Sequence, residues 1–375
     1  SIESGGNYNT VVGDEAGTAL TTGDQNVALG YQAGLSQTTA TQNTLIGAKA
    51  GDALTTGGQN VALGYNALNS DTLGTASVAI GRSALGAQNF TSATNAYNVA
   101  IGYTAGALIT TATFNTLIGG LAGDAITTAD NNTAVGYNSL SANTTGASNT
   151  SVGSGTLLSN TTASNNTAMG LNTLYTNTTG ADNTSIGFAS TYYNTTGANN
   201  TALGSLALQT NTTASNNTAV GQVALTANTT GAGNVAVGTA SLGSNTTASN
   251  NTAVGKDALG ANTGQGNTVL GSSAAEQQTT AQENVIIGFN AGSHTVNLTS
   301  GSFNTLVGSY AHTGSATSAN AVVIGYNVSG DTNYTTLGSN ASDIRAAHGN
   351  VTWATVSDQR YKKDIVDSTA GLSFI

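Results

Sequence analysis

A short apolar run followed by a glycine recurs at nearly constant spacing along this chain of 375 residues. The spacing is 17 residues in 15 of 18 steps, and the other three steps measure 21, 16 and 20 residues. The 19 marker glycines are Gly13, Gly30, Gly47, Gly64, Gly81, Gly102, Gly119, Gly136, Gly153, Gly170, Gly187, Gly204, Gly221, Gly238, Gly255, Gly271, Gly288, Gly308 and Gly325. A fixed period of this kind indicates a solenoid, in which each repeat buries its apolar side chains against its neighbours.

The residues before each glycine predict a short strand. With the glycine numbered zero, position −1 is Val, Ile, Leu or Met in every repeat, and position −2 is mostly Ala. Successive residues of a strand point to opposite faces, so −1 and −3 share one face and −2 lies on the other. We predict that the large residue at −1, represented by Val135, Val152 and Met169, forms the core line and that the small residue at −2 points outward.

A second apolar pair follows at positions +3 and +4, as in Ala207 and Leu208, and predicts a second short strand. A turn rich in Asn, Thr and Gly then closes the coil. We therefore predict an all-β fold, a parallel β-roll or β-helix of about 19 coils that occupies residues 1–328. One such coil has a small core, so we expect self-association along the rod, with the −2 line or the +3 and +4 lines as the seam.

Glycine and asparagine have definite places in this coil. The marker glycines, among them Gly136, Gly153 and Gly170, allow a positive φ angle or a close backbone approach at a tight turn. Position −4 is Asn in 17 of 19 repeats, and position +7 is Asn in eight successive repeats. Stacked coils place like residues above like, so we expect side-chain amide ladders. The asparagines that represent the −4 ladder are Asn132, Asn149 and Asn166.

Composition supports a thin, ordered, uncharged rod. Charged residues make up only 6% of the chain, against roughly 25% in an average soluble domain, and an aliphatic residue still precedes every marker glycine. Proline is absent, which suits a ladder that needs every backbone N–H. Cysteine is absent too, so disulfides and thiolate metal sites are excluded.

Charge and residue clusters exclude several functions. Residues 1–344 carry 14 acidic and 3 basic residues, a net −11, and residues 345–375 carry 3 acidic and 4 basic residues, a net +1. No basic stripe exists, so we expect no nucleic-acid binding, and no apolar run is long enough to insert in a membrane. His294, His312 and His348 are scattered and are expected in exposed turns. We predict no metal, no cofactor and no enzyme active site within the repeats.

The strand motif resembles a known family. Segments 77–81 (Ser-Val-Ala-Ile-Gly) and 98–102 (Asn-Val-Ala-Ile-Gly) are similar to the head repeats of trimeric autotransporter adhesins. That resemblance implies left-handed parallel β-rolls with three chains side by side. The longer form at 132–146 resembles repeats of phage tail fibres.

The C-terminal segment 353–365 resembles the start of the intramolecular chaperone of endosialidase-type tail spikes and fibres, a self-cleaving peptidase family. The family pattern Ser-Asp-x-Arg-x-Lys is matched by Ser357, Asp358, Arg360 and Lys362. The resemblance implies that Ser357 is the nucleophile, that Lys362 is its base, and that cleavage falls between Ser357 and Asp358. A desolvated neutral lysine suits that role. Residues 329–357 are then a neck, and residues 358–375 begin the chaperone.

These observations together predict the distal shaft of a homotrimeric phage tail fibre. It would lie outside the cell on the virion and attach to a host-surface receptor, a glycan or another outer structure, with other fibre and tail proteins as partners. One alternative is a trimeric adhesin on a bacterial surface. The second is an ice-binding solenoid, which the sequence disfavours because position −3 mixes Thr with Val and shares the predicted core face.

Overall fold

The computed structural model describes residues 6–340, 342–349 and 354–355, and the chain divides into two compact units, Ser1–Ala248 and Ser249–Ile375. The described residues form strands and turns and no helix. The two units together hold about 19 turns of a parallel β-solenoid with a period near 17 residues. The predicted all-β parallel solenoid, with its number of coils and its period, is therefore confirmed.

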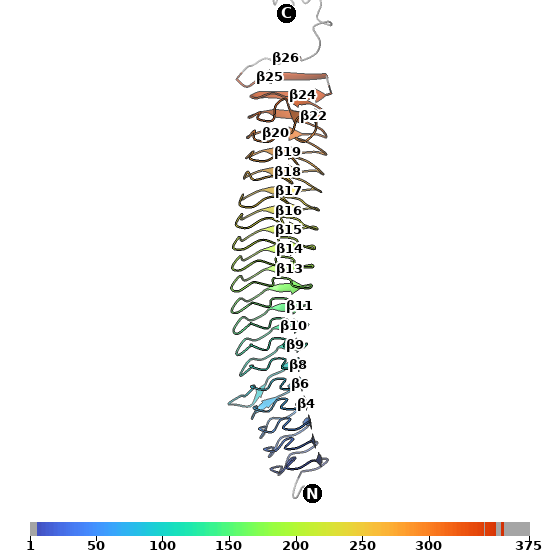
Figure 1. The fold of residues 1–375 in the computed structure, drawn as a ribbon, viewed down its shortest axis with the longest axis vertical. Coiled ribbons are helices and arrows are strands. Elements are labelled where there is room, and N and C mark those ends of the chain that lie inside the picture. The colour runs from blue at the N-terminus through green and yellow to red at the C-terminus, as the bar shows by residue number, and fades with distance from the viewer. Residues whose placement is uncertain (1–5, 341, 350–353, 356–375) are drawn as a thin grey trace, which may run out of the picture. The chain divides into compact units, whose positions relative to one another are not determined.

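In the first unit a three-residue strand precedes each marker glycine, and two shorter strands, β5 and β7, pair beside the coil (Figure 1). The strands are β1 (Thr10–Val12), β2 (Val27–Leu29), β3 (Thr44–Ile46), β4 (Val61–Leu63), β5 (Gly74–Thr75), β6 (Val78–Ile80), β7 (Thr94–Asn95), β8 (Val99–Ile101), β9 (Thr116–Ile118), β10 (Thr133–Val135), β11 (Thr150–Val152), β12 (Thr167–Met169), β13 (Thr184–Ile186), β14 (Thr201–Leu203), β15 (Thr218–Val220) and β16 (Val235–Val237).

Consecutive coils of this unit stack in parallel and in register. Thr133 of β10 pairs with Thr150 of β11, and Val135 pairs with Val152. Like positions therefore lie above one another at the spacing of neighbouring strands, about 4.8 Å.

The second unit is built from the same kind of coil but ends in a different arrangement. Its strands are β17 (Thr252–Val254), β18 (Thr268–Leu270), β19 (Val285–Ile287), β20 (Thr305–Val307), β21 (His312–Thr313), β22 (Val322–Tyr326), β23 (Ser329–Gly330), β24 (Tyr334–Ser339), β25 (Ser342–Ala347) and β26 (Ala354–Thr355). Parallel pairing runs through β24, whereas β25 is antiparallel to β24, and β26 is antiparallel to β25. Part of the predicted neck is thus a sheet that reverses direction.

One ion pair braces this reversal. Arg345 Nη1 of β25 donates to Asp331 Oδ2 at 2.6 Å, and the guanidinium lies 5.4 Å from the centre of the Tyr334 ring. Both partners of Arg345 belong to the loop and strand that β25 covers, so the hairpin is joined to the last parallel strand by side chains as well as by backbone.

The predicted second strand at +3 and +4 is wrong, because these positions form a turn. Three non-glycine positions of a typical coil have a positive φ, namely −5, +2 and +4, seen as Asn165 (62°), Asn172 (54°) and Leu174 (49°). Left-handed geometry costs a residue such as leucine roughly 1–2 kcal/mol. Leu174 is fully buried, and burying a leucine gains about 1.5–3 kcal/mol, which offsets that cost.

The strand faces opposite to the prediction. Position −2 is buried in 18 of the 19 coils, and no residue at −1 is buried in any coil. Val135 and Val152 are partly exposed, and Met169 is 45% exposed. The core line therefore consists of the residues at −2, most of them small, together with the residues at +3 and +4, and the predicted core line is an outer line.

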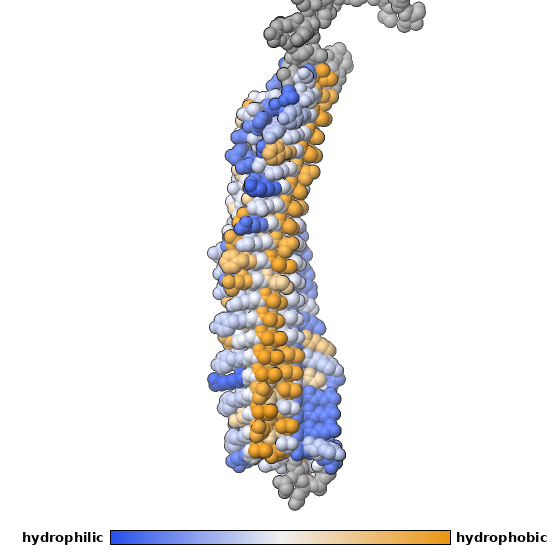
Figure 2. Space-filling model, turned by 90° about the vertical axis from the view of Figure 1, so that its right-hand side faces the viewer, coloured by the Kyte–Doolittle hydropathy of each residue, from blue (hydrophilic) through white to orange (hydrophobic). Residues whose placement is uncertain are grey.

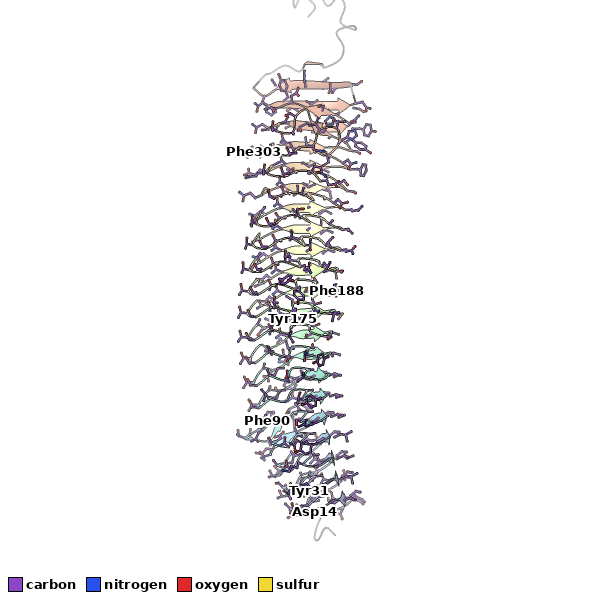
Figure 3. All side chains as sticks on the ribbon, in the orientation of Figure 1. Asp14, Tyr31, Phe90, Tyr175, Phe188 and Phe303 are labelled. Carbon is purple, nitrogen blue, oxygen red and sulfur yellow. The ribbon has the colours of Figure 1, made fainter. Side chains whose placement is uncertain are left out.

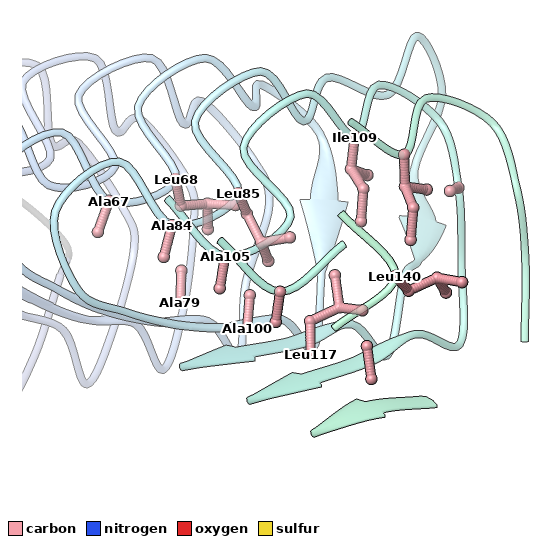
Figure 4. Close-up of a cluster of buried hydrophobic side chains, with 14 of the residues drawn as sticks. Ala67, Leu68, Ala79, Ala84, Leu85, Ala100, Ala105, Ile109, Leu117 and Leu140 are labelled. Carbon is pink, nitrogen blue, oxygen red and sulfur yellow. The ribbon is translucent and has the colours of Figure 1, made fainter. Parts of the chain in front are cut away.

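The narrow interior explains why the small residue lies inside. Where +4 is leucine, −2 is small and +7 is polar, as in Ala168, Leu174 and Asn177. In four coils of the first unit +4 is glycine and +7 is aliphatic, as in Gly123 and Ile126. A Cβ added to Gly123 would lie 2.8 Å from the side chains of Leu117 and Ile126, so a coil holds only a fixed apolar volume. Figure 4 shows this packing around Leu85, Ile109 and Leu117.

The predicted amide ladders are confirmed. Asn149 donates its backbone N–H to Asn132 Oδ1 (3.0 Å) and its Nδ2 to Ala163 O (2.9 Å), and Asn166 repeats the first contact onto Asn149 (3.0 Å). The +7 asparagines form a second ladder, in which Asn160 Nδ2 donates to Asn143 Oδ1 at 2.9 Å. Both ladders are buried, so each amide satisfies backbone groups that the turns leave unpaired.

The 21-residue step places its extra residues beside the coil. Phe90 within it is buried, and β7 pairs with β5 of the preceding coil. In Figure 3 Phe90 lies on the side of the coil away from the strand ends, whereas Phe188 lies beside them. The extra residues therefore form a small packed extension of the coil.

We expect Gly170→Ala to destabilise the protein by about 3 kcal/mol or more. Gly170 has a φ of 130°, and an added Cβ would lie 2.6 Å from Gly187 O in the next coil. The matched control is Gly120→Ala, whose Cβ would meet nothing closer than Tyr137 Cδ2 at 3.7 Å. Thermal melting followed by circular dichroism measures both. Equal melting temperatures for the two variants would show that the corner does not require glycine.

We also expect the +4 and +7 positions to be coupled. Leu174→Gly alone opens a cavity, and Asn177→Leu alone crowds Leu174 and interrupts the ladder, each costing about 2 kcal/mol or more. The double variant recreates the packing of the coils with glycine at +4, so we expect a coupling energy of at least about 1 kcal/mol in denaturant unfolding. Strictly additive effects would contradict the fixed-volume interior.

Candidate functional site

The most distinctive surface is the side of the coil that carries the strands. Positions −4 and −2 point inward, so −5, −3, −1 and +1 point outward and form four parallel lines, which we call the outer face. Because the coils stack in register, the −3 and −1 lines present one residue type or a close variant at every step, whereas the −5 and +1 lines vary from coil to coil. The outer face is thus a repeated surface built from the strand and its two flanking residues.

The centre of the outer face is apolar. Position −3 is Thr or Val and position −1 is Val, Ile, Leu or Met, and Figure 2 shows apolar residues gathered in a band along the strands. Exposed side chains at −1 of the first unit include Leu29, Leu63, Ile118, Met169 and Leu203. An aliphatic residue in contact with water at every coil is unusual for a monomer and marks an interaction surface.

One border of the outer face, position −5, is mostly polar. Gln42 Nε2 donates to Gln25 Oε1 (3.1 Å), and Gln59 continues the ladder onto Gln42 (3.2 Å). Aromatic rings interrupt it at Tyr97 and Phe114, which stack with centroids 5.7 Å apart.

The opposite border, position +1, carries exposed aromatic rings. In the first unit these are Tyr31, Tyr65, Tyr103, Tyr137 and Phe188. Arg82 lies on the same line, in the coil between Tyr65 and Tyr103. The apolar centre is therefore flanked by a polar border and by an aromatic border.

The dimensions of the outer face allow a stable interface. The first unit contains 14 marker glycines, from Gly13 to Gly238, which makes 13 steps of about 4.8 Å, or roughly 62 Å. The six residue steps from −5 to +1 span about 20 Å. The product, roughly 1,200 Å², exceeds the ~800 Å² per partner that a standard protein interface buries.

The predicted structural residues keep their backbone roles. Gly136, Gly153 and Gly170 have φ angles of 135°, 136° and 130°, as a left-handed corner requires. Asn132, Asn149 and Asn166 belong to the buried ladder described above. The role of Val135, Val152 and Met169 is corrected, because they belong to the outer face.

The seam prediction is also corrected. The residues at −2, +3 and +4 lie inside their own coil, as Ala168, Thr173 and Leu174 do, so they are not accessible to another chain. Sequence reasoning missed the outer face because it assigned the larger side chain to the core.

The predicted cleavage residues Ser357, Asp358, Arg360 and Lys362 lie outside the described residues. The histidines lie in the second unit. His294 is exposed, but His312 is buried, contrary to the prediction, with its Nδ1 3.0 Å from Tyr310 O. The two imidazole centroids are 6.1 Å apart, and no group of three or more metal-ligating side chains occurs among the described residues.

Two ionisable groups have environments that shift their acidity. Burial raises the pKa of Asp52, and the charge of Lys49 opposes that shift. Burial also raises the pKa of Tyr192, whose ring stacks on Tyr175 with centroids 4.9 Å apart. Both shifts are accounted for by burial and by the neighbouring side chains Lys49, Tyr175 and Tyr193.

Comparison with protein-family models, with curated proteins and with solved structures finds no match to this chain. Within the described ranges, no helix is long and apolar enough to cross a membrane.

Proposed function

We propose that this chain is a structural fibre protein, the distal shaft of a homotrimeric phage tail fibre, in which the outer faces of three chains pack together. The observation that carries the proposal is the uninterrupted aliphatic line at position −1 of the first unit. The interior of each coil is already filled, so covering this line requires another molecule. The in-register stack makes a parallel copy of the same chain the best match, because its line has the same length and spacing.

The free energy of such packing is sufficient. If half of the roughly 1,200 Å² outer face is apolar, its burial contributes on the order of 15 kcal/mol at ~25 cal/mol per Å². Association costs about 4–15 kcal/mol in lost translation and rotation. The balance favours a lasting assembly, and a three-fold arrangement gives every chain two partners along its length.

We expect the purified protein to have three times the chain mass by light scattering. In the variant Val152→Asp with Met169→Asp, two carboxylates per chain enter the apolar seam, so we expect dissociation to single chains. The matched control is Thr162→Asp, which adds a carboxylate at an exposed turn position away from the strands and should leave the trimer intact. A wild-type mass of one chain would overturn the proposal.

The role on a virion is proposed from the C-terminal motif. In this proposal the segment that starts near Ser357 belongs to a chaperone that aligns the three chains and is then removed between Ser357 and Asp358. Mass spectrometry of the full gene product tests this proposal. We expect the mature protein to end at Ser357, and we expect the Ser357→Ala variant to remain uncleaved. Attachment to a host surface would then use the shaft or its tip. The adhesin alternative would use the same trimeric packing on a bacterial surface.

One observation favours the ice-binding alternative. Position −3 faces outward, contrary to the reason for which the sequence disfavoured this function, and seven successive coils carry Thr there, from Thr116 to Thr218. The neighbouring −1 side chains differ in length, from Val135 to Met169, so the surface lacks a uniform height. We therefore expect no thermal hysteresis, and a measurable freezing-point gap at micromolar protein would favour this alternative.

A further inference from the structure

The aromatic border has a regular spacing of its own. At position +1, tyrosine occurs in alternate coils four times in succession, as Tyr31, Tyr65, Tyr103 and Tyr137. These rings are 47%, 50%, 53% and 59% exposed. Two coil steps separate successive rings by about 9.6 Å. We call this line, together with Arg82, the tyrosine track.

Arg82 is held between two of these rings. Its guanidinium carbon lies 5.9 Å from the centre of the Tyr65 ring and 5.7 Å from that of Tyr103. Both distances lie within the range of a cation–π interaction, so the two rings favour this position of the guanidinium, and no hydrogen bond or ion pair of the Arg82 side chain occurs among the described residues. A preorganised donor loses little entropy on binding an acceptor.

The rest of the first unit is acidic. It carries nine acidic residues and two basic residues, Lys49 and Arg82, a net 2 − 9 = −7. Lys49 interacts with the nearby carboxylate of Asp52. Lys49 lies at position +2, off the +1 line, so Arg82 is the cation of the tyrosine track, and it lies in the middle of the track.

We propose that the tyrosine track binds a linear polysaccharide, with one disaccharide unit for each tyrosine. The C–H faces of pyranose rings pack on exposed aromatic rings, and sugar hydroxyl or carboxylate groups accept hydrogen bonds from a guanidinium. The spacing of two coils is close to the length of a disaccharide in an extended β-linked chain. Four tyrosines in a row would each bind one sugar unit weakly, and the four contacts together would raise the affinity for a polysaccharide chain.

Other ligands fit the track less well. Single-stranded nucleic acid also stacks on aromatic rings, but it brings one phosphate charge per nucleotide to a unit of net charge −7. An apolar peptide would find wider apolar area at the centre of the outer face than at its border. A glycan with at most one charge per disaccharide suits both the rings and the single cation of the track.

The proposal names a ligand class for the attachment role proposed above and in that sense rests on it. It requires that the +1 border stay at the accessible margin of the assembled trimer while −3 and −1 form the seam. The two ideas fail separately, because the trimer is measured by mass and the track by glycan binding.

The experiment is calorimetric titration of the purified chain with β-linked di-, tetra- and hexasaccharides. Chitin oligomers serve as the neutral probe, and hyaluronan oligomers serve as the acidic probe. We expect the affinity to rise at each length up to the hexasaccharide, because the track, roughly 29 Å from its first to its last ring, offers places for four disaccharides. A stronger response to hyaluronan would assign Arg82 to a carboxylate, and equal responses would assign it to hydroxyls.

The variants locate the binding site. We expect Tyr65→Ala with Tyr103→Ala to lower the affinity at least tenfold, and Arg82→Gln to lower it severalfold. The matched control is Phe188→Ala, which removes one exposed ring from the same line outside the track and should leave the affinity unchanged. All variants should keep the wild-type mass and melting temperature.

Three results would overturn the proposal. The first is no binding by either probe at millimolar concentration. The second is binding that the track variants do not weaken. The third is loss of the trimer in Tyr65→Ala with Tyr103→Ala, which would place these tyrosines in the seam and leave the self-association proposal standing.

Discussion

The limited volume inside one 17-residue coil governs the rest of this structure. Most coils of the first unit hold either a leucine at +4, with a small residue at −2 and a polar residue at +7, or a glycine at +4 with an aliphatic residue at +7. Leu174 fills this space from a backbone in the left-handed region. In the coil of Gly123, which has no side chain, Leu117 and Ile126 fill the same space. Each interior position is therefore chosen by volume and not by hydrophobicity alone.

A narrow interior has two consequences for stability. Asparagine ladders replace part of the apolar core, and each amide depends on the coils above and below it, so a coil has little stability by itself. The ladders run through the stack, as from Asn143 to Asn160, and the antiparallel strand β25 pairs with the last parallel strand of the second unit. Each coil is therefore ordered only as part of the stack, and a substitution that breaks a ladder in one coil also destabilises the coils next to it.

The second consequence is that large aliphatic residues are displaced to the surface. Met169 has no room beside Leu174, and every coil carries an aliphatic residue at this outer position; the proposed trimer would cover this line with identical chains. The same stacking that aligns this line also aligns the tyrosines of the +1 border. Assembly and ligand binding would therefore use neighbouring lines of one repeated surface, the first through its apolar centre and the second through its aromatic margin.

The sequence by itself determined the parallel solenoid, its period, the positive φ of the marker glycines and the asparagine ladders, because each follows from a local backbone requirement or from the stacking of like residues. It did not determine which face of the strand is inside. Alternation shows that −1 and −2 face opposite ways, but the choice depends on what the far side of the coil contributes. Only the tertiary structure placed Leu174 opposite Ala168, and that contact sends Met169 outward because the interior has no room for both large side chains.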